Sequence, residues 1–286
     1  MAVEVVPQTQ AIGAEVRGVD LSKEISQEEF EQIRQAFYRH SVIVVRDHAF
    51  DDEDHIRFSS RFGELKRLKF NDFIGKGRPE IFIVSNVKEN DKYIGSHDAG
   101  MFWHSDGPFL KHPHGPAALH ALEVPMHDGR ALGDTRFAST AAAYDALSDS
   151  MKQQLDGLLA VHSLKQRYEK AVKEGGVADS STMNQAATQE TEAVHPLVRV
   201  HPHNGRKCLY VSEGYTTRIL GMPLEQSREL IDELTAHIIK PQFVYTHSWR
   251  AHDLVMWDNC STQHKATFDY EPQQRRLMHR TTLLNS

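Results

Sequence analysis

The sequence has few cysteines, no long apolar run and no excess of positive charge. Only two cysteines, Cys208 and Cys260, occur among 286 residues, which excludes a disulfide framework or a zinc ribbon and favours a reducing compartment. No segment approaches the roughly 18 apolar residues that a membrane-spanning helix needs. Lysine and arginine number 33 against 39 acidic residues, giving a net charge of −6. Binding to nucleic acid or to a membrane surface is therefore not expected.

The chain also lacks signals of secretion and of division into domains. The first residues, MAVEVVPQTQ, contain no basic region followed by an apolar one, so we expect no secretory signal and a cytoplasmic location. No internal repeat and no Pro/Gly-rich linker separates one part from another. With 40% hydrophobic and 25% charged residues, the sequence predicts a single globular domain spanning residues 1–286.

Short strands with helices outside them are the predicted architecture. The capping-box pattern Ser26-Gln-Glu-Glu29 predicts the start of a helix that ends near His40. Further helices are expected over 52–62, 148–159 and 223–239, and strands over 3–6, 41–46, 81–84, 117–124, 197–201, 207–212, 243–249, 253–257 and 276–283. Many short strands with turns between them favour a sandwich or barrel, here a mainly β fold with flanking helices.

The stretch 165–193 differs from the rest of the chain. It is rich in Gln, Thr, Ser, Glu and Gly and has little periodicity. A segment of this length without regular structure is uncommon as a plain connection. We interpret it either as disordered or as a lid inserted into the domain.

A possible metal site begins in the segment Trp-His-Ser-Asp at 103–106. In an extended segment, His104 and Asp106 project from the same face. One imidazole and one carboxylate are two thirds of the 2-His-1-carboxylate set that binds non-heme Fe(II). With 18 histidines in the chain, a polar surface strand would also explain this pair. His264, after a predicted strand and turn, could supply the second imidazole, although a solvent-exposed or core-packed histidine is the alternative.

Two arginines share one face of the last predicted strand. With a period of two, Arg276 and Arg280 point the same way as Met278 and Thr282. If that face lines a barrel, each guanidinium needs an anion, because a buried unpaired charge costs several kcal/mol. The planar fork of arginine suits a carboxylate or sulfonate. An internal ion pair with Asp or Glu is the alternative for both.

Several motifs in order carry a resemblance to a known family. His-x-Asp is followed by Gly-Asp-Thr at 133–135, by Trp-Asp-Asn at 257–259, by His264 and, twelve residues later, by Arg276. Further matches lie at 13–21, 61–63, 142–147 and 205–211. This order resembles the taurine and aryloxyalkanoate dioxygenases, Fe(II)- and 2-oxoglutarate-dependent enzymes on a double-stranded β-helix, the jelly roll of cupin-like proteins. The resemblance runs from the first strand to the last.

The resemblance implies roles for individual residues. It implies that His104, Asp106 and His264 bind Fe(II), and that Thr135 and Arg276 hold the distal carboxylate of 2-oxoglutarate. O₂ would be the other co-substrate, and the Asp106 carboxylate implies hydroxylation rather than halogenation. The sequence departs from its relatives at Leu132, where they have a further glycine before Gly-Asp-Thr.

The resemblance also implies where the substrate binds. Arg280 is similar to the arginine that binds the substrate's anionic group, and Phe70, Phe102 and Tyr215 are expected to form apolar walls. A small anionic organic substrate with a hydrophobic body, such as an aryloxyalkanoate, carboxylate or sulfonate, is therefore favoured. Hydroxylation beside an ether oxygen or sulfur would cleave that bond. The alternatives are taurine or an amino-acid-like substrate undergoing desaturation or isonitrile formation, and a non-catalytic module that binds a metal or 2-oxoglutarate.

Two further expectations complete the sequence-based prediction. Relatives are commonly dimers or tetramers, so a homo-oligomer is expected. The pairs His112-Pro-His114 and His201-Pro-His203 are interpreted as surface turns, because each lies in a loop-like stretch without an obvious acidic partner.

Overall fold

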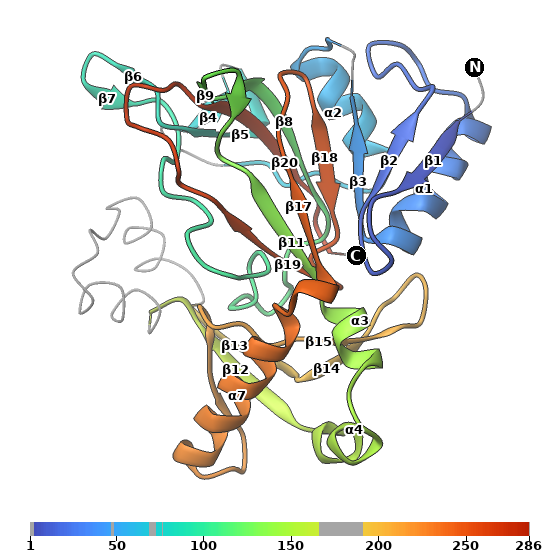
Figure 1. Cartoon of the computed structure of the whole chain (residues 1–286), viewed down its shortest axis with the longest axis vertical. Coiled ribbons are helices and arrows are strands. Elements are labelled where there is room, and N and C mark those ends of the chain that lie inside the picture. Colours follow the sequence, from blue (N-terminus) through green and yellow to red (C-terminus); the bar gives the residue numbers. More distant parts are fainter. Residues whose placement is uncertain (1–2, 47–48, 69–72, 76, 166–190, 286) are drawn as a thin grey trace.

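The computed structural model describes residues 3–46, 49–68, 73–75, 77–165 and 191–285. The described chain is mainly β with flanking helices, as predicted (Figure 1). The helices are α1 (Gln27–His40), α2 (Asp52–Ser60), α3 (Thr140–Asp145), α4 (Asp149–Leu155), α7 (Leu224–Ile238) and the short 3₁₀ helix η1 (Pro241–Phe243).

The largest sheet among the described residues has eight strands. In spatial order it contains β1 (Glu4–Pro7), β2 (Ala14–Arg17), β3 (Val42–Val45), β18 (Leu254–Trp257), β8 (Ala117–Glu123), β20 (Leu277–Thr282), β5 (Arg78–Ser85) and β4 (Ile74–Gly75). Only β2 and β3 pair in parallel; the other neighbours in this sheet are antiparallel. Strands from the C-terminal part of the chain, β18 and β20, lie between strands from its N-terminal half, so residues distant in sequence become neighbours.

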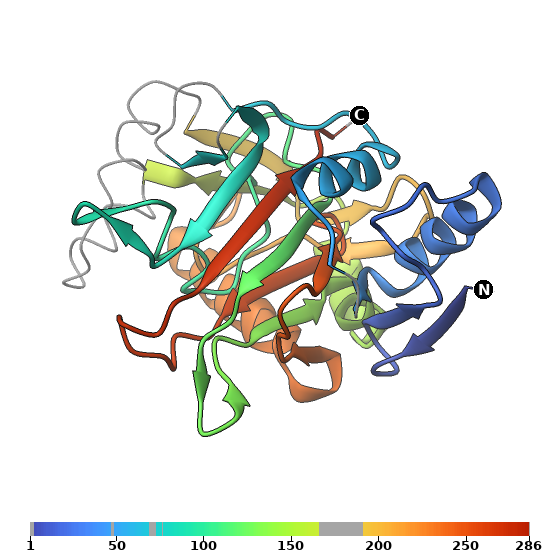
Figure 2. The same ribbon diagram turned by 90° about the horizontal axis from the view of Figure 1, so that it is seen from above.

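A three-stranded sheet packs against this large sheet. It has β11 (Thr135–Ser139) in the middle, flanked by β17 (Val244–His247) and β19 (Thr262–Ala266). Phe137 and Tyr245 of the small sheet share one buried hydrophobic cluster with Leu119, Val255 and Met278 of the large sheet. Figure 2 shows the strands of the large sheet crossing the molecule. The candidate site is built between these sheets.

The N-terminal helix covers part of the large sheet. α1 begins as predicted: the Ser26 side chain accepts the Glu29 N–H while Glu29 reaches back to the Ser26 N–H. Phe37 and Ile33 on its apolar face pack into the cluster that contains Ile43. The capping box fixes the helix start and the apolar face fixes its rotation.

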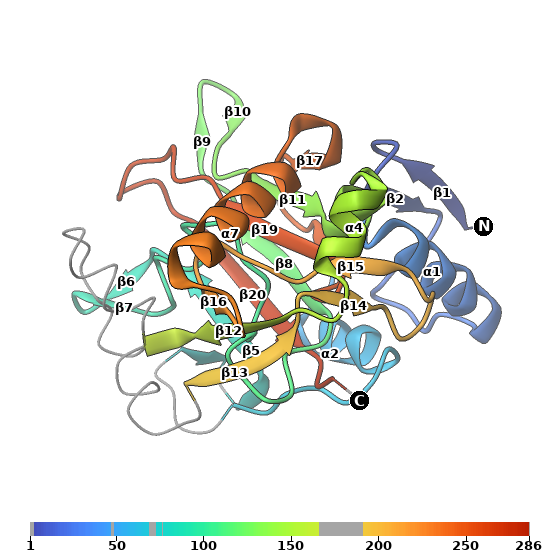
Figure 3. The same ribbon diagram turned by 90° about the horizontal axis from the view of Figure 1, so that it is seen from below.

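A second group of elements lies at one end of the sheets. It comprises α3, α4, α7 and five strands: β12 (Leu159–Ser163), β13 (Glu192–Pro196), β14 (Val198–Val200), β15 (Lys207–Leu209) and β16 (Thr216–Ile219). Figure 3 looks onto this end, with α7 and α4 in front. Two hairpins, β6 (Lys88–Glu89) with β7 (Lys92–Tyr93) and β9 (Met126–His127) with β10 (Arg130–Ala131), complete the strands.

Some predicted boundaries were wrong. The helix expected over 148–159 ends at Leu155, because Gly157 adopts a φ of 73° that a helix cannot continue, and β12 starts at Leu159. His264 follows β18 and a turn, as predicted, but it lies inside a further strand, β19, that was not predicted. The predicted lid at 165–193 falls mostly on residues 166–190, which lie outside the described residues. None of the described helices is long and apolar enough to span a membrane.

Candidate metal centre and anion sites

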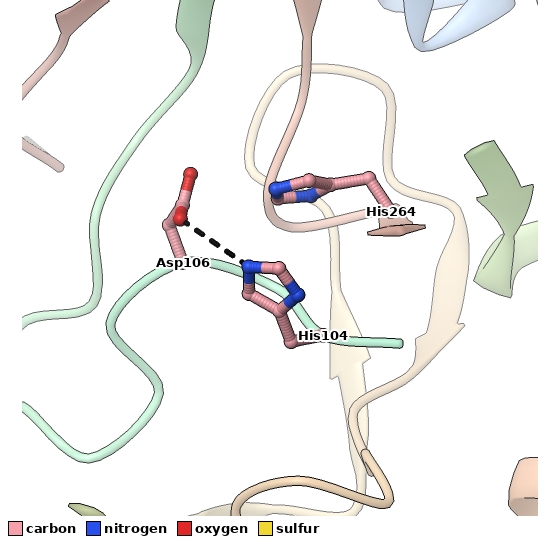
Figure 4. A group of neighbouring side chains, drawn as sticks. All are labelled: His104, Asp106 and His264. Atoms are coloured by element: carbon pink, nitrogen blue, oxygen red, sulfur yellow. Dashed lines mark ion pairs between the residues drawn. The ribbon is translucent and has the colours of Figure 1, made fainter. Parts of the chain in front are cut away.

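Three side chains from two distant segments converge between the sheets. One possible ligand atom from each of His104, Asp106 and His264 lies within 4.8 Å of the others, and Figure 4 shows the three side chains pointing toward one another. The two histidines are held by the backbone: the His104 N–H donates to the His264 carbonyl at 3.1 Å, and the reverse bond measures 2.8 Å. Their rings are 4.2 Å apart. The geometry is therefore set by strand pairing.

The protonation of these groups suits a divalent cation. His104 Nδ1 lies 2.8 Å from the Phe102 carbonyl oxygen; because that oxygen can only accept, Nδ1 carries a hydrogen, and Nε2 is the nitrogen that would bind a metal. Burial, together with the neighbouring His104, lowers the pKa of His264 to about 3, so its imidazole is neutral. Two imidazoles and a carboxylate match the donors of a non-heme Fe(II) site.

The Asp106 carboxylate stays ionised although it is buried. Burial alone would raise its pKa, but Arg280 and then His264 and His104 hold the pKa well below its ordinary value. An Arg280 guanidinium nitrogen lies 3.4 Å from Asp106 Oδ1, and His104 Nε2 lies 3.9 Å from the same oxygen. Oδ1 is therefore the carboxylate oxygen that faces the centre.

Arg276 is a buried cation without an acidic partner among the described residues. It is 6% exposed, its Nε has no hydrogen-bond partner there, and burial lowers its pKa. A Cβ on Gly133 would lie 3.2 Å from Arg276 Nε, so the arginine passes close to the start of β11. There, Thr135 is 5% exposed and its hydroxyl accepts the Trp249 indole N–H at 3.0 Å. A buried guanidinium in such a place requires an anion.

Arg280 lies on β20 with the alternation predicted for that strand. Met278, on the same face, is buried in the cluster between the sheets, whereas His279, on the opposite face, bonds Asp52 at 2.6 Å. The guanidinium carbon lies 5.0 Å from the centre of the Phe82 ring. The internal ion pair considered as an alternative for Arg280 does form, and its partner is Asp106.

Aromatic rings lie beside His104. The Phe102 ring is 5.0 Å from the His104 ring and 5.4 Å from Tyr215, and Phe109 lies 5.4 Å from Tyr215. Phe109 was not predicted, although it follows Asp106 by three residues. Phe70, the remaining predicted wall residue, lies outside the described residues.

Comparison with known proteins identifies the family. The model of the "Taurine catabolism dioxygenase TauD, TfdA family" matches residues 4–282. The chain belongs to this family. It is 34% identical over 275 residues to pentalenolactone F synthase from Streptomyces arenae, covering 93% of this chain and 90% of the relative. It is 30% identical over 297 residues to the alpha-ketoglutarate-dependent 2,4-dichlorophenoxyacetate dioxygenase of Cupriavidus pinatubonensis, covering 100% and 99%.

A solved structure of a similar protein also resembles this TauD/TfdA chain over its whole length. The crystal structure of AAD-2 in complex with Mn(II) and N-oxalylglycine superposes with a TM-score of 0.80 and 29% identity, covering 100% of this chain and 98% of that one. The predicted family and the predicted class of enzyme, a 2-oxoglutarate-dependent dioxygenase, are therefore confirmed.

The prediction of surface turns holds for His112 and His203, which are exposed, but not for His201 and His114. In this TauD/TfdA chain His201 is 2% exposed, and its Nε2 bonds Asp258 at 3.0 Å. The acidic partner is distant in sequence, so the local Pro-containing pattern could not reveal it. His114 is also packed inward, with its Nε2 3.1 Å from Lys66 Nζ. Burial, and then the nearby charge of Arg280, lowers the pKa of Lys66.

Proposed function

We propose that the chain is an Fe(II)- and 2-oxoglutarate-dependent dioxygenase that hydroxylates a small anionic organic substrate with a hydrophobic body. The convergence of His104, Asp106 and His264 in a buried position is the observation that carries this proposal. Three donors on one side of an ion leave positions for the co-substrate and O₂. Bound there, Fe(II) would support oxidative decarboxylation of 2-oxoglutarate to succinate and CO₂, coupled to hydroxylation of the substrate.

The proposed fold is a single domain over residues 1–286 with a double-stranded β-helix, the cupin-like jelly roll. In support, the eight-stranded and the three-stranded sheets share a buried cluster, and the similar solved structures cover the whole chain. A cytoplasmic location and assembly into a dimer or tetramer stay predictions from the sequence.

Arg276 and Thr135 are proposed to hold the distal carboxylate of 2-oxoglutarate. The guanidinium is buried and lacks an acidic partner in the described part of the chain, so an entering carboxylate would neutralise it. A bidentate arginine contact also fixes direction, which would aim the keto-acid end at the metal centre. The Thr135 hydroxyl, whose lone pair is used by Trp249, has its own hydrogen left to donate.

Arg280 is proposed to bind the anionic group of the primary substrate. Its guanidinium borders the metal centre through Asp106, so a bound anion would hold the neighbouring carbon close to the oxidising position. Phe102 and Tyr215 would contact the body of the substrate and exclude water. These rings favour an aryloxyalkanoate, an arylalkyl or alkyl carboxylate, or a sulfonate over a small zwitterion, in line with the substrate that names the Cupriavidus relative.

A substrate panel tests this proposal. Purified protein with Fe(II), ascorbate and 2-oxoglutarate would be given aryloxyalkanoates, aliphatic carboxylates, sulfonates, taurine and amino acids, and succinate formed above the substrate-free rate would be measured. We expect the hydrophobic anions to turn over fastest and His104→Ala to be inactive. Faster turnover of taurine or of an amino acid than of every hydrophobic acid would contradict the proposed substrate class.

A spectrum separates the enzyme from a non-catalytic binding module. Under anaerobic conditions, Fe(II) with 2-oxoglutarate should give a visible metal-to-ligand charge-transfer band, which substrate should change. Admission of O₂ should then remove the band as succinate forms. A band that survives O₂ with substrate present would support binding without turnover.

A further inference from the structure

The side chain of Asn259 grips Asp106 at two points. Asn259 is 2% exposed and lies in the turn between β18 and β19. Its Oδ1 accepts the backbone N–H of Asp106 at 3.0 Å, and its Nδ2 donates to Asp106 Oδ2 at 3.3 Å. One amide therefore fixes both the backbone and the carboxylate of the same residue.

The orientation of this amide follows from its other two contacts. Oδ1 also accepts the Trp257 indole N–H at 3.2 Å, and Nδ2 also donates to the Gly115 carbonyl at 2.7 Å. A flipped amide would direct its NH₂ at two N–H donors and its oxygen at a carbonyl and a carboxylate. Only one orientation satisfies all four partners, so the amide has no alternative position.

The turn that carries Asn259 is itself anchored. The Asp258 carboxylate accepts the backbone N–H groups of Cys260 at 3.1 Å and of Ser261 at 3.0 Å. It also bonds Nε2 of the buried His201, which was predicted to lie in a surface turn, at 3.0 Å. Asn259 thus stands on a rigid turn, and its distance to Asp106 is set by the backbone.

Because of these contacts, the two carboxylate oxygens of Asp106 have different partners. Oδ2 is occupied by Asn259, while Oδ1 faces His104 Nε2 at 3.9 Å. We propose that Asn259 is a positioning residue that makes Asp106 a ligand through one oxygen only. This inference rests on the proposed function. A carboxylate that bound through both oxygens would take one more place on the ion, and this place is needed by 2-oxoglutarate or O₂.

Metal affinity and a spectrum test this role without turnover. Binding of Mn(II) would be measured by titration calorimetry for the wild type, Asn259→Ala and the matched control Asn86→Ala. The Asn86 side chain also accepts one hydrogen bond and donates another, but it contacts the backbone near Arg276 instead of Asp106. Its Oδ1 accepts the Arg276 backbone N–H at 2.8 Å, and its Nδ2 donates to the Gln274 carbonyl at 2.9 Å. We expect a loss of about 10- to 100-fold in Mn(II) affinity for Asn259→Ala, the usual effect of losing a group that orients a ligand, and less than twofold for Asn86→Ala.

Cobalt reports on the ligand geometry directly. In the Co(II)-loaded Asn259→Ala protein, freedom of Asp106 to bind through both oxygens should raise the coordination number and weaken the visible absorption bands. A variant that is merely less stable would keep the wild-type spectrum. Thermal unfolding checks that each variant is folded.

The outcomes separate this inference from the proposed function. A folded Asn259→Ala variant with wild-type Mn(II) affinity and Co(II) spectrum would overturn the role of Asn259, as would an equal loss in Asn86→Ala. A wild-type protein that binds no Mn(II), or binds it as well after His264→Ala, would instead overturn the proposed metal centre.

Discussion

A buried histidine that is not part of the metal centre should make the protein sensitive to acid. His120, in β8, is fully buried, and neither ring nitrogen has a hydrogen-bond partner among the described residues. Its ring stacks on Phe50 with centroids 3.9 Å apart. The titratable groups that act on it are His252, His279, Asp52 and Asp253, and His55 lies 6.0 Å away.

The expected effect follows from the protonation of His120. Burial, reinforced by His252 and His279, lowers its pKa from 6.5 to about 4. The unfolded chain therefore takes up a proton below pH 6.5 that the folded state refuses, and stability present above pH 6.5 is lost as the pH falls toward 4. One unit of pKa difference corresponds to about 1.4 kcal/mol, so this residue should account for about 2 kcal/mol of destabilisation between pH 7 and pH 5.

Urea unfolding at pH 7, 6 and 5 measures this contribution. His120→Leu removes the titrating group and both unpaired nitrogens, so its free energy of unfolding at pH 7 should equal or exceed that of the wild type. Between pH 7 and pH 5 its free energy of unfolding should fall by about 2 kcal/mol less than that of the wild type. His112→Leu, at an exposed position, serves as the control and should behave as the wild type. Metal-free protein is used throughout, because acid also protonates metal ligands. Parallel curves for His120→Leu and the wild type would refute the reasoning.

Three further predictions concern the anion sites and a helix start. Arg276→Met should raise the KM for 2-oxoglutarate by about 30-fold or more, since losing one partner of a buried charge pair costs at least 2 kcal/mol, whereas Arg275→Met, which removes an exposed ion pair with Glu123, should change it by less than twofold. Arg280→Met should raise the KM of the primary substrate while the Kd of 2-oxoglutarate, read from the anaerobic band, stays the same; an unchanged substrate KM would contradict its role. Ser26→Ala should lower the free energy of unfolding by about 1 kcal/mol, because it removes the cap of α1, and kcat should be unaffected.

Local signals predicted the parts of the fold that local interactions determine. The capping box at Ser26 and the apolar periodicity after it predicted α1, which runs from Gln27 to His40. The β-branched run at 41–46 predicted β3. In both cases the residues that form the element also carry its hydrophobic pattern, so the sequence contains its own evidence.

The strands beside the candidate site were harder to predict because their side chains serve other purposes. β19 has the sequence TQHKA, with polar residues on both faces. The first residue of β11, Thr135, turns its hydroxyl toward Trp249 rather than filling the core. Without alternating apolar residues, neither segment had the pattern of a half-buried strand.

The contacts that orient the site depend on residues brought together only by folding. The order of motifs suggested His104, Asp106 and His264 as a set, and the structure brings them together. The grip of Asn259 on Asp106 and the bond from His201 to Asp258 join partners separated by long stretches of chain. Their roles follow from register and amide orientation, which no local pattern encodes.

The reciprocal main-chain bonds between His104 and His264 make the metal centre independent of much that lies between them. Peptide groups provide these bonds, so the bonds themselves do not depend on the side chains of the helices at the far end of the sheets. The elements at the far end of the sheets, α4 and α7 among them (Figure 3), could be lengthened, shortened or exchanged without moving either imidazole. Grafting that whole end from a relative with another substrate preference should therefore be a practical route to redesigning the enzyme.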